Sequence, residues 1–162
     1  MHKTQHDSEM LAEGQQVLTA CAFIWREENG VKKVFLAKRA DGKKFLPGVW
    51  ELPGGHIDYG EEIKAGLARE IMEEFGVQIN IGEVVDVFTY INEVKKSHSI
   101  EVIYFAQFTD PLEHIHPNPE DHSTFGWFAA DELEKTHNSS KGETDPETTA
   151  IRKAFTILEA GK

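Results

Sequence analysis

A glycine-rich loop that runs directly into a helix crowded with carboxylates constrains the fold of this chain more than any other stretch. It extends from Gly54 to Val77. Gly76 stands where a left-handed residue is expected to end the helix. The stretch therefore predicts a turn followed by an amphipathic helix over residues 61–75. Apolar side chains recur at helical spacing and form its buried stripe, at Leu67, Ala68, Ile71, Met72 and Phe75.

Three glutamates of this helix, Glu70, Glu73 and Glu74, fall within an arc of about 100° beside the apolar stripe. Two carboxylates about 4 Å apart repel each other by roughly 4 kcal/mol at an effective dielectric constant of about 20. A folded chain tolerates this repulsion if water screens the charges, if one carboxylate takes up a proton, or if a cation lies between them. The three glutamates are therefore candidate ligands of a divalent cation.

The spacing of these residues is more specific than their density. Gly55 is followed after five residues by Glu61, and after seven more by the run Arg69-Glu70-Ile71-Met72-Glu73-Glu74-Phe75-Gly76-Val77. This pattern resembles, at every specified position, the signature of the Nudix hydrolases, which cleave a nucleoside diphosphate linked to another group. A solvated acidic helix face would explain the glutamates but not the glycines, Glu61 and Arg69 at these offsets.

The length and net charge of the chain restrict the number of domains and the kind of partner it can have. The 162 residues suit one domain with one sizeable core. The net charge of -11 argues against a duplex nucleic acid as partner, because such a partner favours a basic face. An anionic nucleotide, the partner that the resemblance implies, must then be received by local cations or by a bound metal. The oligomeric state stays open, and a homodimer is one arrangement consistent with the sequence.

Cysteine usage and hydropathy bear on the compartment. Cys21 is the only cysteine, so no intrachain disulfide can form, which indicates a reducing environment. Its place in the apolar run 20–23 favours a buried thiol over a nucleophile. The first residues are polar, and no apolar run is long enough to span a membrane. We therefore expect a cytoplasmic protein without a membrane partner.

The order of periodic segments predicts an α/β (α+β) fold with a mixed β-sheet flanked by helices, and the resemblance implies the Nudix α/β/α sandwich. Residues 1–14 are interpreted as a flexible tail, or a short helix over 9–13, and residues 15–162 as a single Nudix domain. Helices are expected over 61–75, from 130 to 135, and from an Asp145-Pro146 cap to about residue 160. Strands are expected over 17–26, 31–38, 50–52, 79–91, 99–109 and 125–128.

The carboxylates suit Mg²⁺, with Mn²⁺ as an alternative ion, because Mg²⁺ prefers oxygen ligands and usually retains waters. Glu70, Glu73 and Glu74 would supply the ligands, and the resemblance implies that the Gly54 carbonyl joins them. Phosphoanhydride cleavage needs charge neutralisation and a positioned water. Either Glu70 or Glu73 could accept the proton of that water.

Two further residues of the signature are assigned to the catalytic machinery. Arg69 is adjacent to Glu70 in sequence, so we expect its side chain to point elsewhere. An ion pair from Arg69 to Glu61, or to another carboxylate, would then brace the loop against the helix.

A later segment, residues 120–127, resembles the loop that supplies a further metal-binding carboxylate in much of the family. Asp121 occupies the position where a glutamate is more usual, and Glu120 lies beside it. Asp121 is therefore a candidate ligand, with a merely solvated loop as the alternative.

Substrate-binding candidates lie on either side of the glycine loop. Arg39 occupies the position at which MutT-like members contact substrate phosphates, with a surface cation as the alternative. Gly55 allows the backbone to approach a phosphate because no side chain intrudes. His56 follows the glycines and could contact a phosphate or the nucleoside, or could be exposed.

The segment 50–61 looks like the loop of Nudix enzymes that act on normal or oxidised nucleoside triphosphates. We therefore favour hydrolysis of a nucleoside triphosphate to the monophosphate and pyrophosphate. A nucleotide-sugar or ADP-ribose-type pyrophosphatase is the alternative within the enzymes. A non-catalytic nucleotide-sensing domain is the alternative of another class, and the complete set of motif carboxylates disfavours it.

Overall fold

The computed structural model describes residues 14–141 and 145–161. The short helix considered over residues 9–13 lies outside the described residues. The elements are, in chain order, β1 (Gln16–Glu28), β2 (Val31–Arg39), β3 (Trp50–Glu51), β4 (Gly54–His56), α1 (Ile63–Phe75), β5 (Ile79–Asn92), β6 (Ser97–Phe108), η1 (Leu112–His114), β7 (His122–Ala129), η2 (Ala130–Thr136), η3 (Ser139–Lys141) and α2 (Pro146–Ala160).

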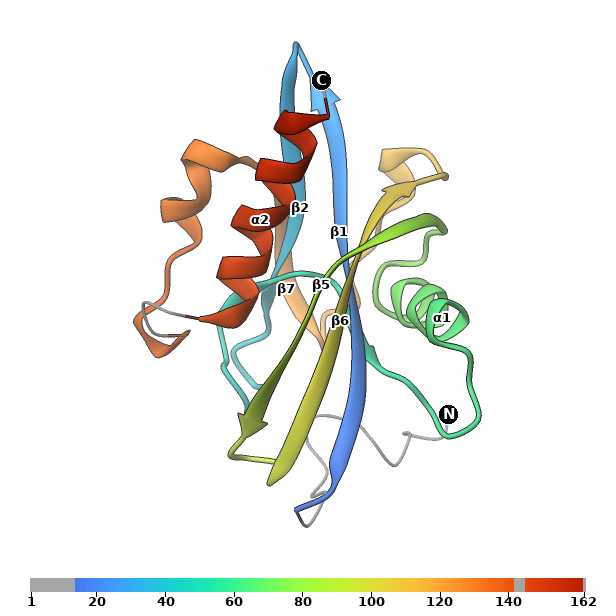
Figure 1. The fold of residues 1–162 in the computed structure, drawn as a ribbon, viewed down its shortest axis with the longest axis vertical. Coiled ribbons are helices and arrows are strands. Elements are labelled where there is room, and N and C mark those ends of the chain that lie inside the picture. Colours follow the sequence, from blue (N-terminus) through green and yellow to red (C-terminus); the bar gives the residue numbers. More distant parts are fainter. Residues whose placement is uncertain (1–13, 142–144, 162) are drawn as a thin grey trace.

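The strands form a mixed sheet in the order β3-β2-β1-β6-β5, with β4 added beside β1 and β7 beside β2. β1 runs parallel to β6 over residues 16–24 and antiparallel to β2 over residues 25–28. The helices α1 and α2 lie on opposite sides of the sheet (Figure 1). This arrangement confirms the predicted fold class of a mixed sheet flanked by helices.

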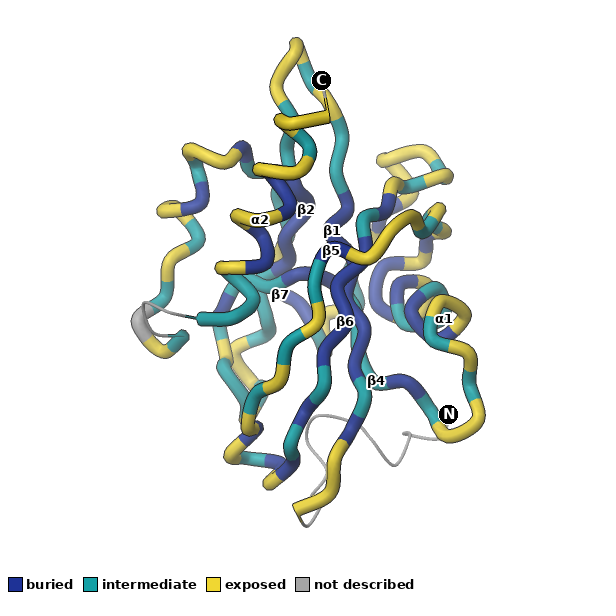
Figure 2. Tube along the Cα trace, viewed as in Figure 1, coloured by how far each residue is buried: buried dark blue, intermediate teal, exposed yellow. Residues whose placement is uncertain are grey.

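Two apolar clusters fill the space on either side of the sheet. On the α1 side, Phe35 of β2 packs edge to face against Phe75, with ring centroids 5.2 Å apart. On the α2 side, Phe23 of β1 packs in the same way against Phe155 at 5.1 Å. The central strands are therefore buried on both faces (Figure 2), which explains the continuous apolar run in β1.

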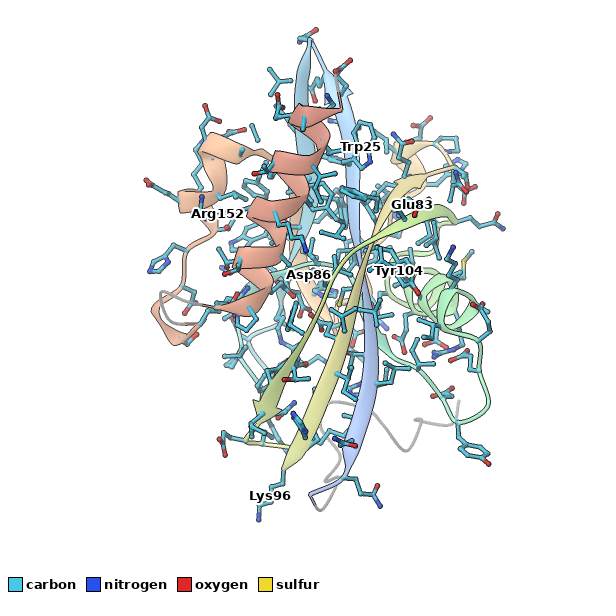
Figure 3. All side chains as sticks on the ribbon, viewed as in Figure 1. Trp25, Glu83, Asp86, Lys96, Tyr104 and Arg152 are labelled. Atoms are coloured by element: carbon cyan, nitrogen blue, oxygen red, sulfur yellow. The ribbon has the colours of Figure 1, made fainter. Side chains whose placement is uncertain are left out.

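Helix α1 begins and ends where the local sequence indicates. The Glu62 carboxylate caps its first turn by accepting from the backbone N–H groups of Lys64 and Ala65. Gly76 ends it in the left-handed conformation, with φ at 71°, as predicted. The Asn29-Gly30 turn joining β1 to β2 has φ of 52° and 79°, which suits a tight hairpin. Lys96 turns β5 back into β6, with its side chain directed away from the sheet (Figure 3).

Two expectations about local structure were wrong. Residues 54–56 form the strand β4 on residues 19–21 of β1, whereas the glycines indicated a loop. β7 begins at His122 instead of residue 125, because its pairing with β2 continues through a bulge near Arg39. The helix expected from 130 to 135 is present as a 3₁₀ helix over residues 130–136. In the described part of the chain, no helix is long and apolar enough to cross a bilayer.

Candidate active site

The glycine loop and α1 are joined by one arginine. Arg69 donates from Nε to Glu61 Oε2 at 2.7 Å and from Nη2 to Glu61 Oε1 at 2.9 Å, a bidentate pair. Nη2 also donates to the His56 carbonyl at 2.9 Å. The guanidinium holds the pKa of Glu61 below its ordinary value. The expected ion pair between Arg69 and Glu61 is therefore present, and it ties the loop to the helix.

The expectation that Arg69 points away from Glu70 was wrong. Nη1 of Arg69 lies 3.1 Å from Glu70 Oε1 and 3.2 Å from Glu73 Oε2. The long side chain folds back over the helix surface, so sequence adjacency did not set its direction. One cation thus compensates several motif carboxylates at once.

Gly66, one turn into α1, is a positioning feature that sequence reasoning missed. A Cβ atom there would lie 2.6 Å from Glu61 Oε1 and 2.7 Å from Ile57 Cδ1. The missing side chain leaves room for the Glu61 carboxylate against the helix. The signal was a glycine inside an otherwise helical pattern, which usually has a packing reason.

The three candidate ligands differ in burial. The Glu73 side chain is 46% exposed, whereas those of Glu70 and Glu74 are 15% and 11% exposed. Burial raises the pKa of Glu70 to about 7, although Arg69 opposes the shift. Burial, and then the charge of neighbouring carboxylates, raises the pKa of Glu74 as well. Helix α1 therefore presents one solvent-facing carboxylate and two that are costly to ionise.

The residues present fit a divalent cation. A Cβ atom on Gly55 would lie 2.5 Å from the carboxyl carbon of Glu70, so this carboxylate lies directly against the loop backbone. Glu74 Oε1 accepts a hydrogen bond from the Gly54 N–H at 3.2 Å. Gly54 itself has φ of 152°, and its Cβ would collide with the backbone of β1, so a side chain is excluded. Glu70 and Glu74 thus place carboxylate oxygens, the hard donors that Mg²⁺ prefers, against the loop backbone.

A buried chain of polar groups behind Glu74 was missed by sequence reasoning. His122 Nε2 lies 2.8 Å from Glu51 Oε2, and its Nδ1 lies 3.6 Å from Glu74 Oε2. The His122 ring is 2% exposed and stacks on Phe75. A histidine at the start of a strand and a glutamate within Trp-Glu-Leu gave weak signals, because both patterns also occur at the surface.

Arg39 lies on this chain of contacts. Its Nη1 lies 3.3 Å from both carboxylate oxygens of Glu51, and its Nε donates to the Phe45 carbonyl at 2.9 Å. Burial alone would raise the pKa of Glu51, but Arg39 and then His122 hold it below the ordinary value. Arg39 lines the candidate cleft. Its assignment to substrate phosphates stays a prediction.

Asp121 also lines the cleft, but its carboxylate accepts a hydrogen bond from Lys43 Nζ at 3.0 Å. Its role as a metal ligand stays a prediction. Lys43 is a cleft cation that sequence reasoning did not single out. His56 lies at the same cleft, with Nε2 3.1 Å from Nζ of the buried Lys95.

These residues surround a cleft of about 1060 Å³. One part is bounded by the glycine loop and the motif glutamates, and another by the start of α2 and the α2-facing side of the sheet. The Phe45 and Tyr90 rings, both on the cleft wall, are nearly parallel at 10° with centroids 6.3 Å apart. The cleft therefore joins a polar, carboxylate-rich region to an aromatic one.

A family model described as NUDIX domain matches residues 15–147, most of the chain. The chain belongs to the Nudix hydrolase family. Nucleoside triphosphatase NudI of Escherichia coli O139:H28 is 38% identical over 60 residues. That match covers 37% of this chain and 42% of the relative, so it spans less than half the relative's length.

Solved structures agree with this assignment. The MutT NUDIX hydrolase from Burkholderia pseudomallei superposes with a TM-score of 0.66 at 26% identity, covering 86% of this chain and 98% of the other. The NUDIX domain of Shewanella oneidensis NrtR, solved with ADP ribose, has a TM-score of 0.67 at 21% identity and covers 88% of each chain. The second likeness concerns the fold alone.

Proposed function

We propose that this Nudix protein is a Mg²⁺-dependent pyrophosphohydrolase that converts a nucleoside triphosphate, normal or oxidised, to the monophosphate and pyrophosphate. The observation that carries the proposal is the contact of Glu70 and Glu74 with the backbone of the glycine loop at the edge of a nucleotide-sized cleft. The similarity to a relative named as a nucleoside triphosphatase supports this substrate class.

The glycine loop, Glu70 and Glu74 would hold the cation, with Glu73 and Asp121 as further candidate ligands. The bound cation would supply charge neutralisation and a more acidic water. Glu70 or Glu73 then accepts the proton of the attacking water. Arg69 positions Glu61, Glu70 and Glu73 for these tasks, since it contacts all three.

The phosphates would lie where the backbone is bare and cations are near. Gly55 admits close approach, and Arg39 and Lys43 line the same cleft. A guanidinium suits a phosphate because it can bond two oxygens at once. In a protein of net charge -11, such local cations are needed to receive a triphosphate. The nucleoside would extend toward the Phe45 and Tyr90 rings, whose faces can stack on a base.

A nucleotide sugar or ADP-ribose is the second candidate substrate. The volume of the cleft is large enough for such a ligand, and the NUDIX domain of NrtR shares this fold and was solved with ADP ribose. A purely nucleotide-sensing role is the remaining candidate, and the retained carboxylates disfavour it.

The test is a substrate panel assayed with Mg²⁺ and with excess chelator, the products being separated by anion exchange. It contains normal and oxidised nucleoside triphosphates, ADP-ribose and nucleotide sugars. We expect metal-dependent release of pyrophosphate and monophosphate from a triphosphate. Turnover of ADP-ribose or a nucleotide sugar alone would replace the proposal by the second candidate. Tight binding without turnover of any compound would support the sensor.

A further inference from the structure

Glu101, near the middle of β6, is a buried carboxyl that the proposed chemistry does not use. It is 6% exposed and lines the cleft on the α2-facing side of the sheet. Thr19 of β1 pairs with His56 of β4 on one side and with Glu101 of β6 on the other. Two strand spacings, about 10 Å, therefore separate Glu101 from the end of the glycine loop. That separation is comparable with the reach from the phosphates to the base of a nucleotide.

The two oxygens of Glu101 have different surroundings. Oε1 accepts hydrogen bonds from the Thr19 hydroxyl at 3.2 Å and from the Cys21 thiol at 3.5 Å. Oε2 is therefore the oxygen that remains to contact a ligand in the cleft. Phe88 and Tyr90 of the adjacent strand β5 line the same region.

A second carboxyl, Glu147 at the start of α2, approaches Glu101. The Cys21 Sγ atom, one carboxylate oxygen of Glu101 and one of Glu147 all lie within 4.8 Å of one another. Glu147 Oε1 is bonded to Lys141 Nζ at 3.1 Å and to the Leu52 N–H at 3.3 Å. Among the described residues, no cation forms an ion pair with Glu101 within 4 Å. The ammonium thus pairs with Glu147, although burial still raises the pKa of that carboxyl as well, and Glu101 is the less compensated of the two.

Titratable side chains from each packed element face Glu101. They are Cys21 from β1, Glu51 from β3, Tyr90 from β5 and Glu147 from α2, with Lys141 behind Glu147. Burial, and then the charge of Glu147, raises the pKa of Glu101 to about 8. The hydroxyl and thiol that bond Oε1 only partly oppose this shift.

We propose that Glu101 determines base specificity: Oε2 of its neutral carboxyl donates a hydrogen bond to a ring nitrogen or carbonyl oxygen of a nucleobase stacked against the nearby aromatic rings. The inference rests on the proposed function, because it assumes that the cleft holds a nucleotide. A base presenting an N–H group at that point leaves two donors facing each other and is disfavoured.

Binding of nucleoside monophosphates in excess chelator tests this proposal without requiring turnover. Titration calorimetry at pH 7 and pH 9 compares the four common bases, each as the ribose and the deoxyribose monophosphate, on the wild-type protein, Glu101→Gln and Glu101→Met. Glu83→Gln is the matched control, since Glu83 is an exposed glutamate of β5 outside the cleft (Figure 3). Circular dichroism verifies that each variant is folded.

We expect the wild-type protein to prefer one base and to lose about tenfold in affinity for it at pH 9, as one buried hydrogen bond is lost. Glu101→Gln keeps an N–H donor at both pH values, so its affinity for that base should change little with pH. Glu101→Met should lose the ranking of bases, and Glu83→Gln should behave as wild type.

An unchanged base ranking in Glu101→Met would overturn the inference. The same holds if this variant changes the ratio of ribose to deoxyribose binding instead of the ranking, because Glu101 would then contact the sugar. Failure of the proposed function looks different: no triphosphate is hydrolysed, whatever the base ranking of the monophosphates.

Discussion

Two groups of glutamates face the same cleft, and their negative charges are compensated differently: by one shared arginine in the first group and by separate cations in the second. The first group, Glu70, Glu73 and Glu74, lies on α1, and Arg69 contacts Glu70 and Glu73 together with Glu61 of the preceding loop. The second group, Glu51, Glu101 and Glu147, comes from β3, β6 and α2; Glu101 is buried, and the other two are partly buried. Its charges are compensated separately, by Arg39 at Glu51 and by Lys141 at Glu147. The first group therefore shares one cation, whereas in the second group Glu101 forms no ion pair with any described residue and has a raised pKa.

The largest difference between the two groups should appear in kcat when one glutamate of each is replaced by glutamine. Glu73→Gln removes a motif carboxylate whose side chain is 46% exposed, so the fold should be unaffected. We expect kcat to fall by at least about 100-fold, as for loss of a metal ligand or general base. Steady-state kinetics with Mg²⁺, alongside a thermal melt, measures both effects. Glu101→Gln is the comparison, and its kcat on the preferred base should stay within a few-fold of wild type. Near-normal kcat in Glu73→Gln would contradict our assignment of the metal site.

Removing the shared cation should destabilise the α1 group. In Arg69→Met the carboxylates of Glu61, Glu70 and Glu73 lose their common partner, and the loop loses the bond from Arg69 to the His56 carbonyl. We expect the free energy of unfolding in urea to fall by about 2 kcal/mol in metal-free protein. Arg152→Met, a change of an exposed arginine on α2, is the control. Added Mg²⁺ should recover part of the loss, because the ion neutralises the same carboxylates. Equal stability of the two variants would show that the arginine does not brace the loop.

A last difference between the groups concerns Glu101 and the pH dependence of stability. Glu101 has a pKa of about 8 in the folded protein against 4.5 as its ordinary value. Between these values the unfolded chain has released the proton and the folded chain retains it. Stability therefore falls as pH rises across this window, with a slope of at most about 1.4 kcal/mol per pH unit for one proton.

The unfolding free energy of metal-free Glu101→Gln should fall less steeply with pH than that of wild type, because the substituted side chain cannot ionise. Urea titrations at intervals from pH 5 to pH 8 measure both slopes, with Glu83→Gln as control. Identical slopes for wild type and Glu101→Gln would mean that Glu101 is ionised throughout, and that the two groups of glutamates do not differ in this respect.

The contiguous part of the site could be predicted from the sequence, and the part assembled from distant strands could not. The helix limits, its glycine cap and the Arg69–Glu61 pair follow from residues within a few turns of one another. Glu51, Glu101 and His122 are separated by tens of residues and meet only through strand pairing. A polar residue on a strand usually indicates a solvent-facing position, and nothing local revealed which of these side chains α1 or α2 would cover. The glycines of β4 indicated a loop for a similar reason, since their pairing with β1 is not a local property.

By itself, the sequence determined the family, the mixed fold and the carboxylate-bearing helix, because spacing along one helix places side chains in space without further information. Only the tertiary structure decided which carboxylates are buried, that Arg69 contacts Glu61, Glu70 and Glu73, and that Glu101 and Glu147 come together while Lys141 pairs with Glu147. The physical reason is that burial and charge compensation are properties of the neighbours a side chain acquires on folding, and these neighbours come from elsewhere in the chain.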